Sequence, residues 1–460
     1  MMQLCQKDKE YVLNAIKCGH IDTASLSLPN LIDTIILTMK QKNLLEPLGD
    51  CLEDKRSDNK KFPFEILLTL AVTAKLKLKT SLTDVPFAVN DAELLSELGW
   101  NVWDTQRDLE NGLFSENVVR RLLEKYDSDE FIACYNKYVQ KQAFPILGFQ
   151  PTIHILDCTK IPVNIRNNNY EKAGVVKIEG ETFRGYKLGV LRGLLDDAGA
   201  VEEITFGSIQ AHDLELCRDM LKTTSCFKEQ DILINDRGFL SRDMMNFLKE
   251  IRRVDTYIPA KKNMTLYEDA VSLAKSNGKW TKHPNKKRKT QQIQLIRDLG
   301  GLWQSKNPEK DVPINACVVK DTKDDSYYVF LTTDLTKTAR QILEIYEIRP
   351  EIEEDFRQLK DFWKLEDFKS TKYNYITFHI VMTLLGYLYF QVYKNIEEGQ
   401  KYRGKSLPVV LKNYKEKKTQ SVIIYAGQYF AVFSFLEFIQ LYAGCSPTIR
   451  KLLDQILSQV

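Results

Sequence analysis

The sequence predicts an α/β protein in which helices cover a sheet. Two short runs of β-branched and apolar residues, Ile153–Asp157 and Ile232–Asp236, are typical of strands, and each ends on an aspartate. Between them, Leu214–Leu221 has the periodicity of a helix. With 460 residues and 43% hydrophobic content, the chain is long enough for a sizeable core in two or three domains.

The remaining elements are predicted in chain order. Residues 1 to about 145 are expected to be mostly helical, because Phe64–Lys77 is an apolar run and Ser115 stands where an N-cap would precede a helix. Ser241 is placed to cap a further helix. Further strands are expected at Phe183–Leu191, Val201–Ile209, Val254–Pro259, Ile314–Val319 and Tyr327–Thr332. From about Thr371 onward the pattern is again helical.

The segment Tyr346–Lys360 sorts into three faces when it is wound as a helix. The apolar stripe that a helix buried along one side requires comprises Ile348, Ile352, Phe356, Leu359 and Trp363. An acidic band typical of a solvated face comprises Glu347, Glu351, Glu354, Asp355 and Gln358. The third strip comprises Tyr346, Arg349, Glu353 and Lys360. A carboxylate there suits a metal and its three companions suit phosphates, while surface ion pairs at the same spacings are the alternative.

Two features of this region bear on its local structure and on its ligands. Pro350 predicts that the helix begins or kinks there, since proline is well tolerated at the first helical position. Asp157 and Asp236 follow strands, and ligand sites in sheets covered by helices collect beyond the carboxyl ends of strands. The alternative is that each aspartate starts a turn or caps a helix, which is more credible for Asp236 because Gly238 follows it.

These residues together resemble the signature of DDE transposases of the insertion-sequence-4 type. The resemblance consists of Asp157, the segment Asp236–Phe239, the strand Gly185–Leu188, and the Tyr-Arg-Glu-Lys spacing of Tyr346, Arg349, Glu353 and Lys360. It covers about residues 150 to 395. It implies a ribonuclease-H-like mixed sheet core with a β-rich insertion, a helical N-terminal domain and a helical C-terminal region.

The resemblance also implies an activity and a metal site. Members of this family cut transposon ends and join them to target DNA by a cut-and-paste reaction. Asp157, Asp236 and Glu353 are expected to be catalytic and to hold two Mg²⁺ or Mn²⁺ ions, since three carboxylates suit hard cations that activate one oxygen and stabilise another. Oxygen ligands argue against zinc.

DNA contacts follow from the same resemblance and from local charge. Tyr346, Arg349 and Lys360 are expected to contact phosphates, with Arg237 as a further candidate. The net charge of +3 is small, so attraction to DNA must come from local patches. One such patch comprises Lys279, Lys282, Lys286, Lys287, Arg288 and Lys289. Trp280 and Trp303 are candidates for stacking on a displaced base, and the alternative for the patch is a solvated hairpin tip.

The predicted organisation divides the chain into five segments. These are a helical, DNA-end-binding domain at 1–145, the first part of the catalytic core at 146–262, a β-rich insertion at 263–337, the catalytic-glutamate helix with core completion at 338–395, and a helical region with possible dimerisation at 396–460. Expected partners are double-stranded DNA, with terminal inverted repeats and a target, and a second copy of the chain. A ribonuclease-H-fold nuclease or resolvase, and a domesticated DNA-binding protein that no longer cuts, are the alternative functions.

Composition favours a cytoplasmic, nucleoid-associated protein. Nine cysteines without Cys-x2-Cys spacing, and five scattered histidines, argue against a disulfide scaffold and a structural zinc site. The first residues lack the apolar run of a signal peptide. Phe378–Tyr393 and Ser421–Ala443 are apolar but contain polar residues, so we expect buried core helices and no membrane span, with a subunit interface as the alternative for the second stretch. His154 is expected to be satisfied by a hydrogen bond and not to be catalytic.

Overall fold

The computed structural model describes residues 5–56, 62–100, 112–196, 198–299, 311–413 and 421–458. The chain forms two compact units. The first unit comprises Met1–Cys134 with Leu359–Val460, and the second comprises Tyr135–Gln358. The five-segment division expected from the sequence stays a prediction.

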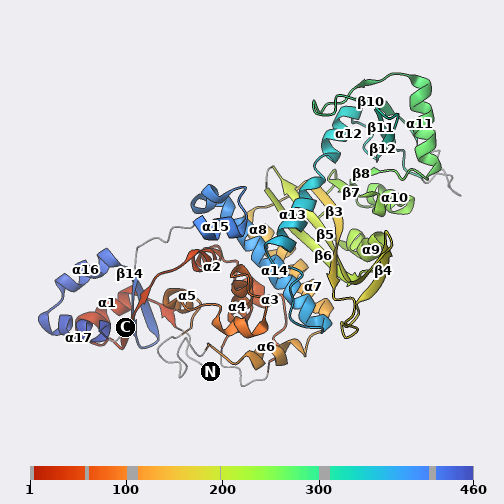
Figure 1. Ribbon diagram of the computed structural model, residues 1–460. Helices are drawn as coiled ribbons and strands as arrows, with labels where there is room; N and C mark the ends of the chain where they lie inside the picture. The colour runs from red at the N-terminus through yellow and green to blue at the C-terminus, as the bar shows by residue number, and fades with distance from the viewer. Residues whose placement is uncertain are drawn as a thin grey trace. The chain divides into compact units, whose positions relative to one another are not determined.

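The second unit is built on one large mixed sheet (Figure 1). Its strands are β3 Ile153–Val163, β4 Gly174–Ile178, β5 Glu181–Leu195, β6 Ala198–Ser208, β7 Ile232–Asn235, β8 Asp255–Pro259, β9 Thr281–Lys282, β10 Gln291–Ile296, β11 Asn315–Asp321 and β12 Tyr327–Thr332. Their order is β4-β5-β3-β7-β8-β12-β11-β10-β9, and β6 pairs with β5. Strands β3, β7 and β8 are parallel, whereas β5 is antiparallel to β3 and to β6. The α/β class with a mixed sheet is therefore confirmed.

Helices cover this sheet. They are α8 Phe144–Leu147, α9 Asp213–Thr223, α10 Arg242–Glu250, α11 Thr265–Asn277 and α12 Ala339–Tyr346, with short helical turns η3 Val139–Ala143 and η4 Arg237–Phe239. Ser241 caps α10 as predicted, since its side chain accepts a hydrogen bond from the backbone N–H of Met244. Apolar residues of α9, α10 and α11 bury one core together with residues of β3, β7, β8 and β11.

The strands between 263 and 337 extend the same sheet. Strand β12 pairs antiparallel with β8, from Phe330 opposite Pro259 to Thr332 opposite Tyr257. Strands β11, β10 and β9 then follow in order, each antiparallel to its neighbour. Figure 1 shows α11 and α12 on opposite sides of these strands, against which both helices pack.

The first unit is mostly helical. Its helices are α1 Lys9–Cys18, α2 Leu31–Gln41, α3 Glu46–Asp50, α4 Phe64–Leu76, α5 Ala92–Glu97, α6 Glu116–Leu123, α14 Tyr373–Asn395, α15 Leu407–Asn413, α16 Phe435–Gly444 and α17 Pro447–Leu457, with η1 Leu82–Phe87 and η7 Glu397–Tyr402. Helices α7 Ser128–Tyr138 and α13 Pro350–Asp361 each contribute residues to both units. Of the described residues, only those of α14 form a helix long and apolar enough to span a membrane, and 89% of its apolar window is buried within the protein.

The two ends of the chain also form a small sheet, which the sequence analysis did not anticipate. Strands β1 Gln6–Lys7, β14 Tyr429–Ser434, β13 Ser421–Ala426 and β2 Thr23–Ser27 pair in that order. The prediction of a core helix through Ser421–Ala443 is therefore wrong for its first part. Gly427, in the left-handed conformation with φ 60°, begins the two-residue turn that joins β13 to β14.

Candidate active site

Two of the three predicted acids lie at equivalent positions on neighbouring parallel strands. The parallel pairing of β3 with β7 ends at Leu156 opposite Asn235; Asp157 is the next residue of β3, and Asp236 directly follows the end of β7. Adjacent strands lie about 4.8 Å apart, so the two acids are neighbours. The prediction that both strands end on an acid is not fully met: β7 ends at Asn235, one residue before Asp236, and β3 does not end at Asp157. Strand β3 continues to Val163 because β5 pairs with it along its whole length.

The third acid comes from a helix that begins as predicted. Helix α12 ends at Tyr346, and α13 begins at Pro350, where the missing N–H of proline costs no helical hydrogen bond. The apolar stripe of this segment is buried, with Ile352 and Leu359 fully enclosed. Glu353 is therefore carried in the first turn of α13 on a face next to the buried one.

One guanidinium group joins the two chain segments. Arg349 donates from Nη2 to Oδ2 of Asp157 and from Nη1 to Oε1 of Glu353, each over 2.6 Å. The backbone N–H of Cys158 donates to the other oxygen of Asp157 over 2.8 Å. The side chain of Glu353 is 55% exposed, whereas those of Asp157 and Arg349 are 14% and 17% exposed. Hydrogen bonds between mostly buried groups therefore fix Asp157 and Arg349, whereas Glu353 is open to solvent.

The electrostatics place Asp236 in the same cluster. Burial raises the pKa of Asp157 to about 6, with Arg349 opposing the rise and the charge of Asp236 adding to it. Burial also raises the pKa of Tyr346 to about 12, and the charges of all three acids contribute. Burial would lower the pKa of Arg349, but the charge of Asp157, with those of Asp236 and Glu353, raises it. Arg349 is therefore a permanent cation among three carboxyl groups.

Arg192 is a further residue of this site, and the sequence analysis missed it. It lies on β5 with 8% of its side chain exposed, and its guanidinium contacts two acids of α13. The Nε–Oδ2 distance to Asp355 is 2.6 Å, and the Nη1–Oε2 distance to Glu351 is 2.9 Å. Since these acids stand two residues either side of Glu353, Arg192 fixes the helix that carries it. An arginine inside the apolar run Leu188–Leu195 was the signal that could have revealed it.

The acidic band expected on Tyr346–Lys360 is less solvated than predicted; Glu347 of this band lies at the end of α12, and the other members lie on α13. Asp355 is 13% exposed, and Glu347 lies 3.7 Å from Arg288 between Oε1 and Nε. Glu354 fits the prediction, because it is exposed and pairs with Arg357 on the same helix. The band therefore divides into acids that fasten the helix and acids that face water.

The site offers suitable metal donors in an arrangement that does not hold a metal. Carboxylate oxygens suit hard divalent cations such as Mg²⁺ or Mn²⁺. However, within the described part of the chain, no group of three or more His, Cys, Asp or Glu side chains is spaced to hold an ion. The guanidinium of Arg349 instead satisfies Asp157 and Glu353. The donor chemistry fits such a cation only after these ion pairs are broken.

The four residues predicted to contact phosphates differ in burial and in their partners within the protein. The Nε of Arg349 is buried and has no hydrogen-bond partner among the described residues, so an acceptor reaches it only if the guanidinium moves. Tyr346 packs its ring on Phe330, with centroids 4.7 Å apart. Lys360 lies two turns along α13 from Glu353, about 10 Å along the axis, and pairs with Glu366 over 2.8 Å. Arg237 lies exposed in η4, directly after Asp236, with no ion pair to any described residue.

The four consecutive basic residues of the patch are exposed as predicted, but within the described residues neither tryptophan is seen in a position to stack on a base. Lys286, Lys287, Arg288 and Lys289 are all exposed in the turn that joins β9 to β10. This placement suits both DNA contact and the alternative of a solvated hairpin tip. Trp280 is half-buried against the core of the second unit, 6.3 Å from Tyr327 between ring centroids, and so is not free to stack as it stands. Trp303 lies outside the described residues.

Comparison with protein families identifies a matching family for this chain. A family model described as a transposase DDE domain matches residues 155–389, just over half of the 460 residues. The matched range begins two residues before Asp157 and extends beyond Lys360, so it contains every residue of the cluster around Arg349. A search of curated proteins found no match to the chain.

Proposed function

Since the chain belongs to the transposase DDE domain family, we propose that it is the transposase of an insertion sequence of the insertion-sequence-4 type. In this proposal it cuts the ends of its own transposon and joins them to target DNA by cut-and-paste. The strands β3, β5, β6, β7 and β8 form the ribonuclease-H-like core. Tyr346, Arg349, Glu353 and Lys360 are the Tyr-Arg-Glu-Lys signature.

The observation that carries the proposal is the convergence on Arg349. Three acids from β3, β7 and α13, separated by up to 196 positions in the chain, act on one guanidinium group. Surface ion pairs join near neighbours and contribute little, whereas Arg349 joins Asp157 of β3 to Glu353 of α13 at a partly buried position. The charge of Asp236 acts on the same guanidinium. Such a set of perturbed groups beside an open face is typical of a catalytic site.

The side chains of the cluster have distinct roles in the proposed reaction. Asp157, Asp236 and Glu353 are the catalytic carboxylates. Arg349 and Tyr346, together with Lys360 and Arg237, contact DNA phosphates. The guanidinium offers a planar fork that matches phosphate oxygens, and the unpartnered Nε gives it a donor for them. A phosphate that draws Arg349 toward itself leaves Asp157 and Glu353 free of their ion pairs.

A divalent cation would then have these carboxylates as ligands. Enzymes of this family generally use divalent metals, and two such ions, when bound, activate the attacking oxygen and stabilise the leaving one. What the chain itself does is hold the acids at fixed positions, through β3, β7 and the Arg192 contacts on α13. It also places cationic groups against the phosphates of the cleaved strand.

The proposed substrate and partners follow from this reaction. The substrate is double-stranded DNA that carries the terminal inverted repeats of the transposon, followed by a target duplex. Two copies of the chain bring the two ends together, and the protein works in the cytoplasm at the nucleoid.

The test replaces Glu353 and measures DNA cleavage. Glu353→Gln removes the charge without changing the size of the side chain, and we expect it to lower cleavage of labelled end DNA in Mg²⁺ by about 10³-fold or more. Binding of the same DNA should stay within about twofold. Glu354→Gln is the matched control, because this neighbour pairs only with exposed groups of its own helix, and it should cut at the wild-type rate.

The outcomes also separate the alternatives. A Glu353→Gln protein that nicks end DNA at the wild-type rate contradicts the catalytic assignment. If the wild-type protein cuts end DNA but does not insert pre-cleaved ends into a target plasmid, the protein is a nuclease or resolvase. If it binds the ends and never cuts, it is a DNA-binding protein that has lost the activity.

A further inference from the structure

A cleft lies at the edge of the large sheet, where β10 meets α11 and α12. Its volume is about 820 Å³, which is within the range of ligand sites in proteins. The C-terminal end of α11 lines one side and the start of α12 lines another, with β10 between them. None of the predicted catalytic residues lines this cleft.

The edge of the sheet is open at this place. Strand β9 pairs with β10 only at Gln292 and Ile293, so Gln294–Ile296 have no strand on their outer side among the described residues. An uncovered strand edge presents backbone N–H and C=O groups, which proteins usually protect with charges or cover with another element. Here the edge is surrounded by charges of one sign.

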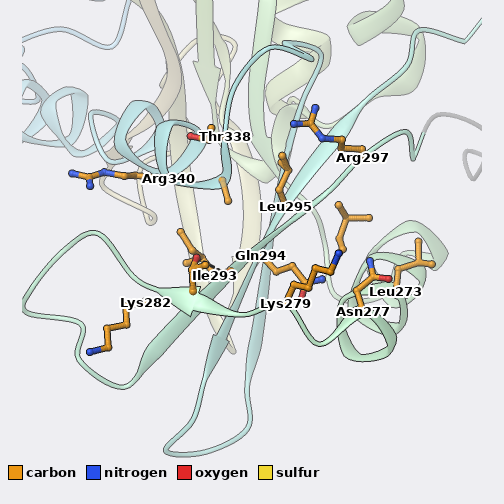
Figure 2. A pocket seen from close by; sticks show the side chains of 13 residues that line it. Leu273, Asn277, Lys279, Lys282, Ile293, Gln294, Leu295, Arg297, Thr338 and Arg340 are labelled. Atoms are coloured by element: carbon orange, nitrogen blue, oxygen red, sulfur yellow. Dashed lines mark hydrogen bonds between the residues drawn. The ribbon is translucent and has the colours of Figure 1, made fainter.

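Four cationic side chains surround the open edge. Lys279 precedes β9, Lys282 is its last residue, Arg297 directly follows β10, and Arg340 is in the first turn of α12; all four are exposed. Figure 2 shows Lys282 and Arg340 to one side of β10 and Lys279 and Arg297 to the other. Arg340 pairs with Glu344 over 2.7 Å on its own helix. The other three form no ion pair with a described residue, and no acidic residue lines the cleft.

A buried amide completes the site. Gln294 is 4% exposed and lines the cleft, and its Oε1 is buried without a hydrogen-bond partner in the described part of the chain. Burying such a group without a partner costs about 1–3 kcal/mol. A ligand that hydrogen-bonds Gln294 would recover that cost. Glutamine amides both donate and accept, which matches the mixed donors and acceptors on the edge of a DNA base.

We propose that this cleft binds a strand of DNA, with its phosphates on Lys279, Lys282, Arg297 and Arg340 and a base edge on Gln294. The inference rests on the proposed function, to which it adds a second DNA-binding site outside the acidic cluster. A repeating polyanion accounts for cations on both sides of β10, and a base accounts for a neutral hydrogen-bonding group recessed between them. An acidic peptide pairing with the open edge would use the cations but has no need of the amide.

The first test removes two cations and measures affinity. The full chain carrying Lys279→Ala with Arg297→Ala is titrated into a fluorescein-labelled single strand of about 20 nucleotides, and fluorescence anisotropy is followed. We expect affinity to fall about 10-fold or more, and the slope of log affinity against log salt to fall by about 1.5. The matched control, Lys177→Ala with Lys222→Ala, removes the same charge from exposed sites on β4 and α9, and should change affinity less than twofold.

Equal losses in the two double variants would overturn the site, because they would show attraction to overall charge only. Poly-glutamate that displaces the labelled strand at the same charge concentration as unlabelled DNA would also overturn it, in favour of an acidic peptide. Binding measured in Glu353→Gln protein keeps this test independent of cleavage. Loss of affinity in the cleft variant then stands even if the wild-type protein never cuts DNA.

The second test addresses Gln294 alone. Gln294→Met keeps the length of the side chain and removes its hydrogen-bonding groups, without changing charge or leaving a cavity. We expect the wild-type ratio of affinities for oligo-dA and oligo-dT to move at least threefold toward one in the variant, while the melting temperature stays the same or rises. An unchanged ratio would overturn the base contact.

Discussion

Strand β3 carries two clusters of the same chemical type, three residues apart. At Asp157, a guanidinium lies between two carboxylates, those of Asp157 and Glu353. At His154, an imidazole lies between two carboxylates, with Nδ1 2.6 Å from Glu202 and Nε2 3.1 Å from Asp231. In each cluster a cation joins β3 to another element of the second unit.

The two clusters differ in their contact with water. The side chains of His154, Glu202 and Asp231 are 0%, 1% and 4% exposed, so neither substrate nor ion can reach them. Glu353 is 55% exposed. A sealed cluster can only fasten the strands that carry it, whereas an open one can exchange its internal cation for a ligand. Burial, and not the identity of the residues, distinguishes a structural clamp from a candidate catalytic site.

The largest effect on stability is expected from His154→Ala. This change leaves Glu202 and Asp231 facing each other without the imidazole, and removing one partner of a buried ion pair costs about 3–5 kcal/mol. Urea unfolding of the full chain measures the loss. Arg349→Ala is the counterpart in the open cluster, and we expect it to cost less than His154→Ala, because water reaches Glu353, although Asp157, only 14% exposed, also loses its partner. Equal losses would contradict the comparison.

The same cluster predicts a dependence of stability on pH. Burial alone would lower the pKa of His154, but the charges and hydrogen bonds of Glu202 and Asp231 raise it to about 9. Because this value lies above the value of about 6.5 in the unfolded chain, the stabilisation is complete below pH 6.5 and is lost as pH rises through 9. The difference in unfolding free energy between wild type and His154→Gln should shrink by up to about 3 kcal/mol over that interval.

A difference that stays constant from pH 6.5 to 9.5 would show that the imidazole of His154 carries no stabilising charge. Comparison with His154→Gln removes the contributions of other titrating groups. Among them is Lys75, which is buried against His379 in the first unit, and whose pKa burial lowers to about 8.

The sequence was most informative where local pattern and chemistry coincide. The buried apolar stripe of Tyr346–Lys360 and the start of α13 at Pro350 follow from helical periodicity and from the geometry of proline, both of which are local. The hydrogen bonds of His154 were also expected, because an ionisable group inside an apolar strand must find a partner. The identity of those partners, 48 and 77 residues away, was not predictable from the sequence.

The sequence was least informative where partners are distant in the chain. Strand β13 pairs with β2, almost 400 residues away, so the small sheet of the first unit has no local signature of its own. The β13–β14 hairpin does have a local signature, because Gly427 and Gln428 separate two apolar runs of equal length. The continuous apolarity of Ser421–Ala443 concealed it, since a short apolar run fits a buried strand and a buried helix equally well.

The smallest loss of cleavage that we predict tests whether contacts behind α13 hold Glu353 in position. Arg192→Gln removes the guanidinium that contacts Glu351 and Asp355, so α13 loses its attachment to β5 and Glu353 is less well fixed. A misplacement of about 1 Å costs up to 100-fold in rate, and we expect cleavage of end DNA to fall about 10- to 100-fold.

If Arg192→Gln only destabilised the fold, DNA binding and DNA cleavage would fall together. Binding of end DNA should therefore be unchanged in Arg192→Gln, Arg192→Lys should recover part of the rate, and Asp355→Asn should reproduce the defect. Because the two changes remove the same contact, the double variant Arg192→Gln with Asp355→Asn should be no slower than the slower single variant. Rates that multiply instead would show that Arg192 and Asp355 act separately, and that the buried ion pair does not position Glu353.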